Sequence, residues 1–381
     1  MSGRVLFVVG ADAARQSDAP RRDYDVIARA VGATMLDRTA VERSLIARLV
    51  RRFAGTAAAQ AWLAFRRRGD FDVILTDGEH VAIPLAILLR IGRSRIRHVT
   101  IGHRLSTPKK RLFFRTLRAH DYMDKIAVHS RHQYEFAVRE LGIPASRLAL
   151  VPYHVDTEFW SPREVEPERL VVSAGLEHRD YSTLMRAARG LNAEFVIGAA
   201  SHWSRHGFST EEQPVNVRVG SFDYRALRDL YARAAVVVVP LRDVDNQAGV
   251  TTILEAMAMG RAVVVTQSIG QTDVVEDRRS RQRGVPRARP ESLIGLLAAE
   301  RGLAAEPNGF YVPPADADAL RRAITYLLDH PAERERLGRA GRKLVERILT
   351  IEQFADRMRD LLTATLEADQ PATPIATLQF S

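Results

Sequence analysis

The residues best suited to chemistry lie in a loop between two β-branched runs, Val236–Val239 and residues 263–265. Each run is short and bounded by turn residues, which is typical of a buried parallel strand. The loop contains Gly249 and leads into a helical pattern over residues 253–259. The first N–H groups of a helix lack partners and carry partial positive charge. This strand–loop–helix unit therefore predicts a site for an anion such as a phosphate.

Two polar side chains stand near that predicted anion site. Glu255 comes about one turn into the helix, where a carboxylate repels a phosphate but can accept hydrogen bonds from a diol such as a ribose. Gln247 lies earlier in the loop and offers amide donors and an acceptor that suit hydroxyl groups. Recognition of a phosphate, a ribose and a polyol within so short a stretch indicates a nucleotide-sugar site.

The same stretch resembles the signature of glycosyltransferase family 4, in which two glutamates separated by seven residues precede the pattern A-M-A-x-G-x-P-V-V. Here Gln247 stands at the first glutamate, Glu255 at the second and Ala262 at the usual proline. The resemblance implies a GT-B fold, with two Rossmann-like domains facing across a cleft, and a retaining, metal-independent transfer from a nucleoside-diphosphate sugar. It also implies that Glu255 holds the ribose and Gln247 orients the donor sugar. The diphosphate would then lie on the backbone of Gly249, Val250, Thr251 and Thr252.

The resemblance assigns further residues in the first half of the chain. A strand at residues 97–101 ends beside His103, which would lie next to the donor sugar. Gly10 ends the first strand, where relatives carry a Gly-Gly pair that contacts the diphosphate or the acceptor. A structural role for His103 is the competing interpretation.

In the second half, Arg179 is the strong cation near the position where relatives carry a lysine on the diphosphate. Leu176 replaces the arginine that relatives usually place just after the glycine at the strand end, and a protonated His178 is one candidate to compensate. The loop that carries Ser221 and Phe222 is expected to receive the nucleobase.

Positive charge is concentrated in the first part of the chain. Residues 1–150 contain 27 Lys and Arg against 14 Asp and Glu, whereas the remaining residues contain 29 against 32. The stretch 41–68 has a basic amphipathic helical pattern, which fits either an anionic lipid surface or a sheet-flanking helix with a solvated arginine face. Residues 108–117 combine Lys and Arg with Phe113 and Phe114, which predicts an interfacial patch. Nucleic acid is the less favoured partner, because the basic residues flank a small-molecule cleft.

Length and composition bound the remaining alternatives. At 381 residues the chain is long enough for two domains, each with its own core. The absence of cysteine excludes disulfides and thiolate chemistry and agrees with a reducing compartment. The longest apolar stretch, residues 81–89, is too short to span a membrane, and the N-terminus lacks the features of a signal peptide. We therefore expect a cytoplasmic protein, peripheral on the inner face of the membrane if its basic surface binds lipid.

These observations predict an N-terminal Rossmann-like acceptor domain over residues 1–160 and a nucleotide-sugar domain over residues 170–350. A helix at residues 351–366 should cross back to the first domain, and residues 367–381 should form a disordered tail. The expected activity is hexosyl transfer from a UDP- or GDP-sugar to a hydroxyl of an unknown acceptor, with roles in glycan or glycolipid biosynthesis and with no cofactor or metal. Catalytic roles are expected for His103, Gln247 and Arg179. A non-catalytic GT-B protein that binds a nucleotide-sugar or a glycan is the alternative, and an epimerase or phosphorylase on the same fold is a third.

Overall fold

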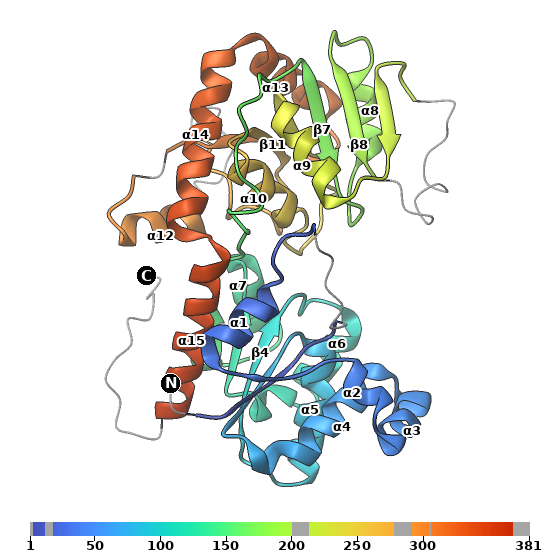
Figure 1. Cartoon of the computed structure of the whole chain (residues 1–381), viewed down its shortest axis with the longest axis vertical. Helices are drawn as coiled ribbons and strands as arrows, with labels where there is room; N and C mark the ends of the chain where they lie inside the picture. The colour runs from blue at the N-terminus through green and yellow to red at the C-terminus, as the bar shows by residue number, and fades with distance from the viewer. Residues whose placement is uncertain (1–2, 12–17, 200–212, 278–291, 305, 369–381) are drawn as a thin grey trace.

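The computed structural model describes residues 3–11, 18–199, 213–277, 292–304 and 306–368. Within them the chain forms two parallel six-stranded sheets, each flanked by helices and each in its own half of an elongated molecule (Figure 1). The expected α/β architecture of two Rossmann-like domains is confirmed. The predicted disordered tail lies, from residue 369 on, outside the described residues.

The first sheet has the strand order β2-β1-β3-β4-β5-β6, and all neighbouring strands pair in parallel. β1 and β3 are buried along their whole length, which is why both read as continuous apolar runs. The sequence pattern did not indicate the edge strand β2, whose Thr34 and Met35 are exposed. The strands are β1 (Val5–Val8), β2 (Thr34–Leu36), β3 (Val73–Thr76), β4 (Arg97–Gly102), β5 (Lys125–Val128) and β6 (Leu148–Leu150).

The second sheet has the strand order β12-β11-β10-β7-β8-β9 and is also parallel throughout. The two β-branched runs of the sequence form its centre, where Val236 lies opposite Ala262. The strands are β7 (Leu170–Ala174), β8 (Glu194–Gly198), β9 (Val217–Gly220), β10 (Val236–Val239), β11 (Ala262–Thr266) and β12 (Gly309–Val312).

The amphipathic stretch at residues 41–68 is three helices rather than one. Ser44 caps the second by accepting a hydrogen bond from the Ala47 N–H, and Gly55 separates the second from the third with a φ of 87°. Residues with a side chain rarely adopt that conformation, so the glycine sets the break. The helices of this domain are α1 (Asp23–Val31), α2 (Thr39–Glu42), α3 (Leu45–Ala54), α4 (Thr56–Arg67), α5 (Glu79–Ile91), α6 (Pro108–Arg115) and α7 (Arg131–Arg139), with 3-10 turns η1 (Arg68–Asp70), η2 (Ala119–Tyr122) and η3 (Ala145–Arg147).

The predicted interfacial patch on α6 is wrong in its aromatic part. Phe114 is completely buried in a core with Met123, and Phe113 packs against the same core. Lys110 also points inward, because its Nζ donates to Glu79 Oε1 at 2.8 Å. The paired aromatics therefore anchor α6 to its own domain.

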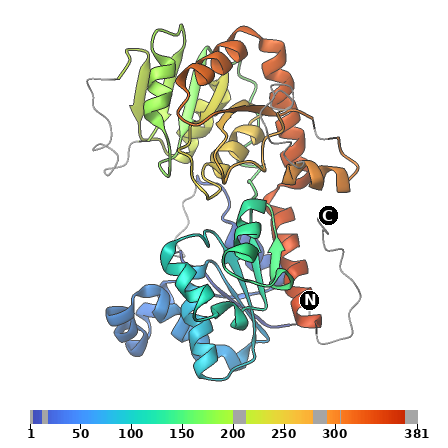
Figure 2. The same ribbon diagram turned by 180° about the vertical axis from the view of Figure 1, so that it is seen from behind.

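The second domain is flanked by further helices, and the last helix of the described chain returns to the first domain. α15 begins with a capping box between Thr350 and Gln353. Its Phe354, Met358 and Leu362 share a core with α1 and β1, and Figure 2 shows it running alongside the N-terminal domain, which confirms the expected crossing. The helices are α8 (Tyr181–Ala188), α9 (Tyr224–Arg233), α10 (Val250–Ala258), α12 (Leu293–Glu300), α13 (Ala317–Asp329), α14 (Pro331–Ile348) and α15 (Ile351–Glu367).

Candidate functional site

The strand order of each sheet marks where a ligand should bind. In the second sheet the order reverses between β7 and β10, and in the first it reverses between β1 and β3. Open α/β sheets bind ligands outside the carboxyl ends of the strands at such reversal points. The loop after β7 carries Arg179, and the loop after β10 carries Gln247 and Gly249. The predicted nucleotide-sugar residues therefore lie at the reversal point of the second sheet.

The N-terminus of α10 is an amide-lined mouth. Gly249 is its N-cap, with a φ of 78°, and a Cβ on this residue would lie 2.6 Å from Val239 Cγ1. Only glycine fits this position without strain. Within the described residues, the N–H groups of Gly249, Val250, Thr251 and Thr252 have no hydrogen-bond partner. The helix dipole and these free donors together form a site for an anion.

Arg179 supplies a buried positive charge beside that mouth. Its side chain donates from Nε to Ala174 O at 3.0 Å, from Nη1 to Glu177 O at 2.9 Å and from Nη2 to Thr252 Oγ1 at 3.1 Å. The residue is only 8 % exposed, and no carboxylate among the described residues forms a salt bridge with it. Burial lowers the pKa of Arg179 from its usual value. A buried cation with only neutral acceptors is costly unless an anion joins it, so this charge favours a bound anion.

Glu255 lies one turn deeper in α10 and carries a strongly shifted carboxyl group. It is 7 % exposed, and its Oε2 accepts a hydrogen bond from the Tyr231 hydroxyl at 3.4 Å. Burial raises the pKa of Glu255 from 4.5 to about 8, although the Tyr231 hydrogen bond and the charge of Arg179 act in the opposite direction. This carboxyl is therefore protonated at neutral pH in the ligand-free protein.

Gln247 and His103 come from different domains and line the same cavity. The cavity lies between the loops after β4 and β10, and its polar lining includes His103, Arg104, Gln133, Asp245, Asn246 and Gln247. Gln247 Oε1 is buried there without a hydrogen-bond partner among the described residues. An unsatisfied buried acceptor next to a cavity is suited to a hydroxyl of a bound ligand. The structure thus brings together two predicted sugar-contacting residues that are far apart in the sequence.

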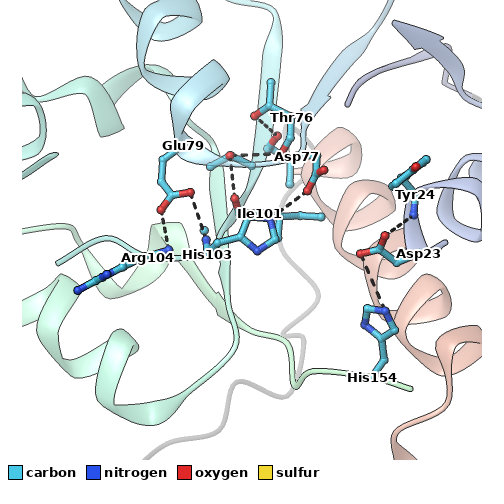
Figure 3. A network of polar contacts seen from close by, with 12 residues as sticks. Asp23, Tyr24, Thr76, Asp77, Glu79, Ile101, His103, Arg104 and His154 are labelled. Atoms are coloured by element: carbon cyan, nitrogen blue, oxygen red, sulfur yellow. Dashed lines mark hydrogen bonds and ion pairs between the residues drawn. The ribbon is translucent and has the colours of Figure 1, made fainter. Parts of the chain in front are cut away.

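A polar network fixes His103 on the N-terminal side of the cleft (Figure 3). His103 Nε2 lies 3.0 Å from Asp77 Oδ1, and Glu79 Oε2 accepts from the His103 N–H at 3.2 Å. Glu79 also accepts from the Arg104 N–H at 2.6 Å. Burial lowers the pKa of His103, but the hydrogen bond and charge of Asp77 more than offset burial, so the pKa is raised. His103 is therefore an oriented donor that carries more positive charge than an ordinary histidine.

The other predicted residues lie at strand ends but not at the mouth of α10. Gly10 follows β1, and a Cβ on it would lie 2.9 Å from His80 Nε2, so the glycine makes room for that ring. Phe222 follows the edge strand β9 and covers Gly220, where a Cβ would lie 3.0 Å from its ring. Within the described residues, no hydrogen bond joins Gly10, Ser221 or Phe222 to α10.

Two residues that the sequence pattern did not single out connect the domains. Arg104 Nη1 lies 3.3 Å from His178 Nε2, and Arg104 Nη2 lies 3.7 Å from Asp245 Oδ1. His178 Nε2 also lies 3.4 Å from Glu177 Oε1, so this ring faces both a guanidinium and a carboxylate. Tyr153 of the inter-domain segment packs against the core that contains α10, and burial raises the pKa of Tyr153 to about 12.

Other features of the described residues do not compete with this site. A larger surface hollow lies at the amino ends of β7, β8 and β9, lined by Asn192, Val215 and Arg218 among others, on the opposite side of the sheet from the loops that carry the candidate residues. Among the described residues, no group of three or more His, Cys, Asp or Glu side chains is placed to hold a metal ion. Nor does any helix in the described part of the chain combine the length and apolar character that crossing a bilayer requires.

Comparison with known families gives a match in each half of the chain. The model of Glycosyltransferase Family 4 matches residues 13–159, and the model of Glycosyl transferases group 1 matches residues 183–330. His103 falls in the first match, whereas Gln247 and Glu255 fall in the second. The search of curated proteins gave no match.

Solved structures share the fold over nearly the whole chain. A glycosyltransferase from Rickettsia africae ESF-5 matches with a TM-score of 0.70 at 12% identity, over 96% of this chain and 100% of that chain. The Anabaena protein HepE, in complex with UDP and glucose, matches with a TM-score of 0.68 at 15% identity, over 95% of this chain and 100% of that chain. Sucrose-phosphate synthase from Thermosynechococcus elongatus matches with a TM-score of 0.66 at 16% identity, over 96% and 100% of the two chains. At these identities the likeness is one of fold.

Proposed function

Since the chain belongs to glycosyltransferase family 4 and has the GT-B fold, we propose that it transfers a hexose from a UDP- or GDP-sugar to an acceptor hydroxyl, with retention and without a metal ion. The observation that carries the proposal is the mouth of α10, where four N–H groups without partners among the described residues stand beside the buried Arg179, whose hydrogen bonds go only to neutral acceptors. A diphosphate satisfies both at once. Glu255 lies one turn deeper in the same helix, where it would bind the ribose that adjoins the diphosphate.

The proposed reaction breaks the bond between C1 of the sugar and the leaving phosphate oxygen while the acceptor oxygen bonds to C1 on the same face. The acceptor proton passes to an oxygen of the leaving phosphate. Negative charge grows on the diphosphate in this step, so preorganised donors aimed at it lower the barrier. Arg179 and the α10 amides supply such donors. Their positive charge would stabilise the leaving diphosphate, as a divalent ion does in other transferases. We propose metal independence on this basis.

The sugar would bind where this cavity lies between the domains; its volume of about 10 Å³ holds about one water molecule, so the domains would have to move apart to admit a hexose. Gln247 Oε1 has no partner within the described part of the chain and would accept from a sugar hydroxyl, while His103, held by Asp77, would donate to another oxygen. The acceptor, a glycan or glycolipid hydroxyl, would approach from the N-terminal domain, where Gly10 and His80 line the reversal point of the first sheet. We retain the expected cytoplasmic location as part of this proposal.

Nucleotide binding by an alanine variant tests the placement of the nucleotide. Glu255→Ala should abolish UDP or GDP binding measured by titration calorimetry, because the ribose loses its proposed hydrogen-bond partner at a buried position. Glu335→Ala on the exposed side of α14 is the matched control and should bind as the wild type does. Unchanged affinity in Glu255→Ala would show that the nucleotide binds elsewhere.

Activity measurements test the chemistry separately. Transfer should continue in the presence of EDTA, and the product should keep the anomeric configuration of the donor. Gln247→Glu distinguishes two roles for the glutamine. Higher activity in the variant would mean that glutamine at this position reduces activity, and lower activity would mean that the amide is adapted to the donor sugar. A product of inverted configuration would refute the retaining mechanism.

A non-catalytic GT-B protein that binds a nucleotide-sugar is the second candidate. Leu176 is 53 % exposed beside the cleft, where an arginine would give a second positive charge for the diphosphate. Fewer cations weaken leaving-group stabilisation more than ground-state binding. Hydrolysis of several nucleotide-sugars, followed over hours, separates the candidates. A transferase slowly transfers the sugar to water and so releases free nucleotide, whereas a binding protein does not.

A further inference from the structure

The outward side of α3 is an exposed apolar stripe. Leu45, Ile46, Leu49 and Phe53 are 76, 57, 57 and 80 % exposed, and their spacing places them along one side of the helix. Together they are called the α3 apolar face below. Scattered exposed leucines are ordinary on a protein surface, but four large apolar side chains on ten residues of helix are not.

The opposite side of α3 is already satisfied by its own domain. Ala47 is buried in a small cluster with Val41 and Ala59, and Val50 packs against the same cluster. The small residues therefore hold α3 to α4, and the large ones point away. Figure 1 shows α3 at the margin of the N-terminal domain, far from α10 and from α15. No rearrangement within the domain is needed to expose the α3 apolar face.

The apolar stripe is bordered by arginines. Arg43, Arg48, Arg51 and Arg52 are all exposed. Arg51 pairs with Glu42, whereas Arg43, Arg48 and Arg52 form no salt bridge among the described residues. This is the composition of a helix that lies in the plane of a bilayer surface, with apolar side chains among the acyl chains and guanidinium groups at the lipid phosphates.

We propose that α3 docks the N-terminal domain on an anionic lipid bilayer. The occupant is a bilayer rather than a second copy of the chain, because a symmetric dimer through this face would bring the same arginines against each other. A bilayer also fits better than an acidic groove on one partner protein, because the excess of positive charge extends over residues 1–150. This part of the chain contains 27 basic and 14 acidic residues. The proposal does not depend on the nucleotide site, since binding to lipid needs no donor or acceptor.

Sedimentation with lipid vesicles tests the proposal. The full chain should sediment with phosphatidylcholine vesicles that contain phosphatidylglycerol, should bind pure phosphatidylcholine far more weakly, and should lose affinity at high salt. The Leu49→Ser/Phe53→Ser variant should lose roughly tenfold in partitioning for each side chain. Arg48→Gln and Arg52→Gln should each lose about fivefold, since one arginine near an anionic surface contributes about 1 kcal/mol.

Matched variants away from the helix keep the test specific. Ile91 is 75 % exposed at the end of α5, and Arg139 is exposed on α7, so Ile91→Ser and Arg139→Gln remove similar groups from the same domain. These two variants should bind as the wild type does, and all variants should keep the UDP-induced rise in melting temperature. Equal losses in the control variants, equal binding to pure phosphatidylcholine, or no binding at all would overturn the proposal. So would a lipid-free dimer that the Leu49→Ser/Phe53→Ser variant abolishes, because a second copy would then be the occupant.

Discussion

Replacing Glu255 with glutamine should stabilise the ligand-free protein at neutral pH, although the residue is part of the binding site. Burial raises the pKa of Glu255 from 4.5 in an exposed chain to about 8 in the fold. Between these values the unfolded chain has lost a proton that the folded chain keeps, so stability falls as pH rises. One unit of pKa difference corresponds to about 1.4 kcal/mol, so the loss is about 3 kcal/mol at pH 7 and about 5 kcal/mol above pH 8. Glutamine cannot ionise and avoids the loss.

Urea unfolding of both proteins between about pH 5 and about pH 9 measures this difference. All other titrating groups are common to the two proteins, so the difference in unfolding free energy isolates Glu255. It should be small near pH 5, grow by about 1.4 kcal/mol per pH unit and level off above pH 8. UDP binding by Glu255→Gln should weaken by at least roughly tenfold above pH 8, where the wild-type carboxyl is ionised and accepts from the ribose hydroxyls more strongly than an amide does. A difference that does not change with pH would mean that the carboxyl is ionised in the fold and would refute the reasoning.

Two further predictions concern buried ionisable residues. Arg179→Met should weaken UDP binding by roughly 10- to 100-fold, the usual contribution of charged hydrogen bonds, while binding of uridine is unchanged; equal loss for uridine would show that Arg179 does not serve the phosphates. His129→Asn should make the protein less sensitive to acid. Burial lowers the pKa of His129 from 6.5 to about 3, so the wild type loses stability as pH falls from 6.5 towards 3, by about 2 kcal/mol at pH 5. The Asn side chain can still donate to Val151 O, as His129 Nδ1 does at 2.9 Å, and melting temperatures of the two proteins that stay parallel down to pH 5 would contradict this assignment.

Features set by local sequence were predictable. The runs at β10 and β11 are apolar on both faces, as buried parallel strands must be. Serine is a typical N-cap residue, and the Ser130 side chain accepts from the Gln133 N–H at the start of α7. Gly260 follows the end of α10 with a φ of 70°, a conformation that glycine adopts most readily. In each case the residue type and its immediate neighbours determine the backbone.

Features set by distant contacts were not predictable from one sequence. Arg104 and His178 are 74 positions apart and meet only because the two domains face each other. Phe114 looked like a surface residue because it sits among cations, yet the fold places Met123 against it. The resemblance supplied the roles of Glu255 and Gln247, but the pKa of Glu255 depends on how deeply the fold buries it. Periodicity also could not locate Gly55 as a break, since apolar residues continue at helical spacing on both sides.

Because α15 returns to the first domain, the second domain can complete its folding before the first, although the first is synthesised earlier. The N-terminal sheet leaves the ribosome first, but Phe354, Met358 and Leu362, which complete its core, are translated last. The core of the nascent first domain therefore stays partly exposed until α15 has been made. The second domain can fold earlier, because β7 to β12 and α8 to α14 all precede α15 in the chain. A chain stopped after α14 should keep a folded second domain and present a first domain that is prone to chaperone capture and proteolysis.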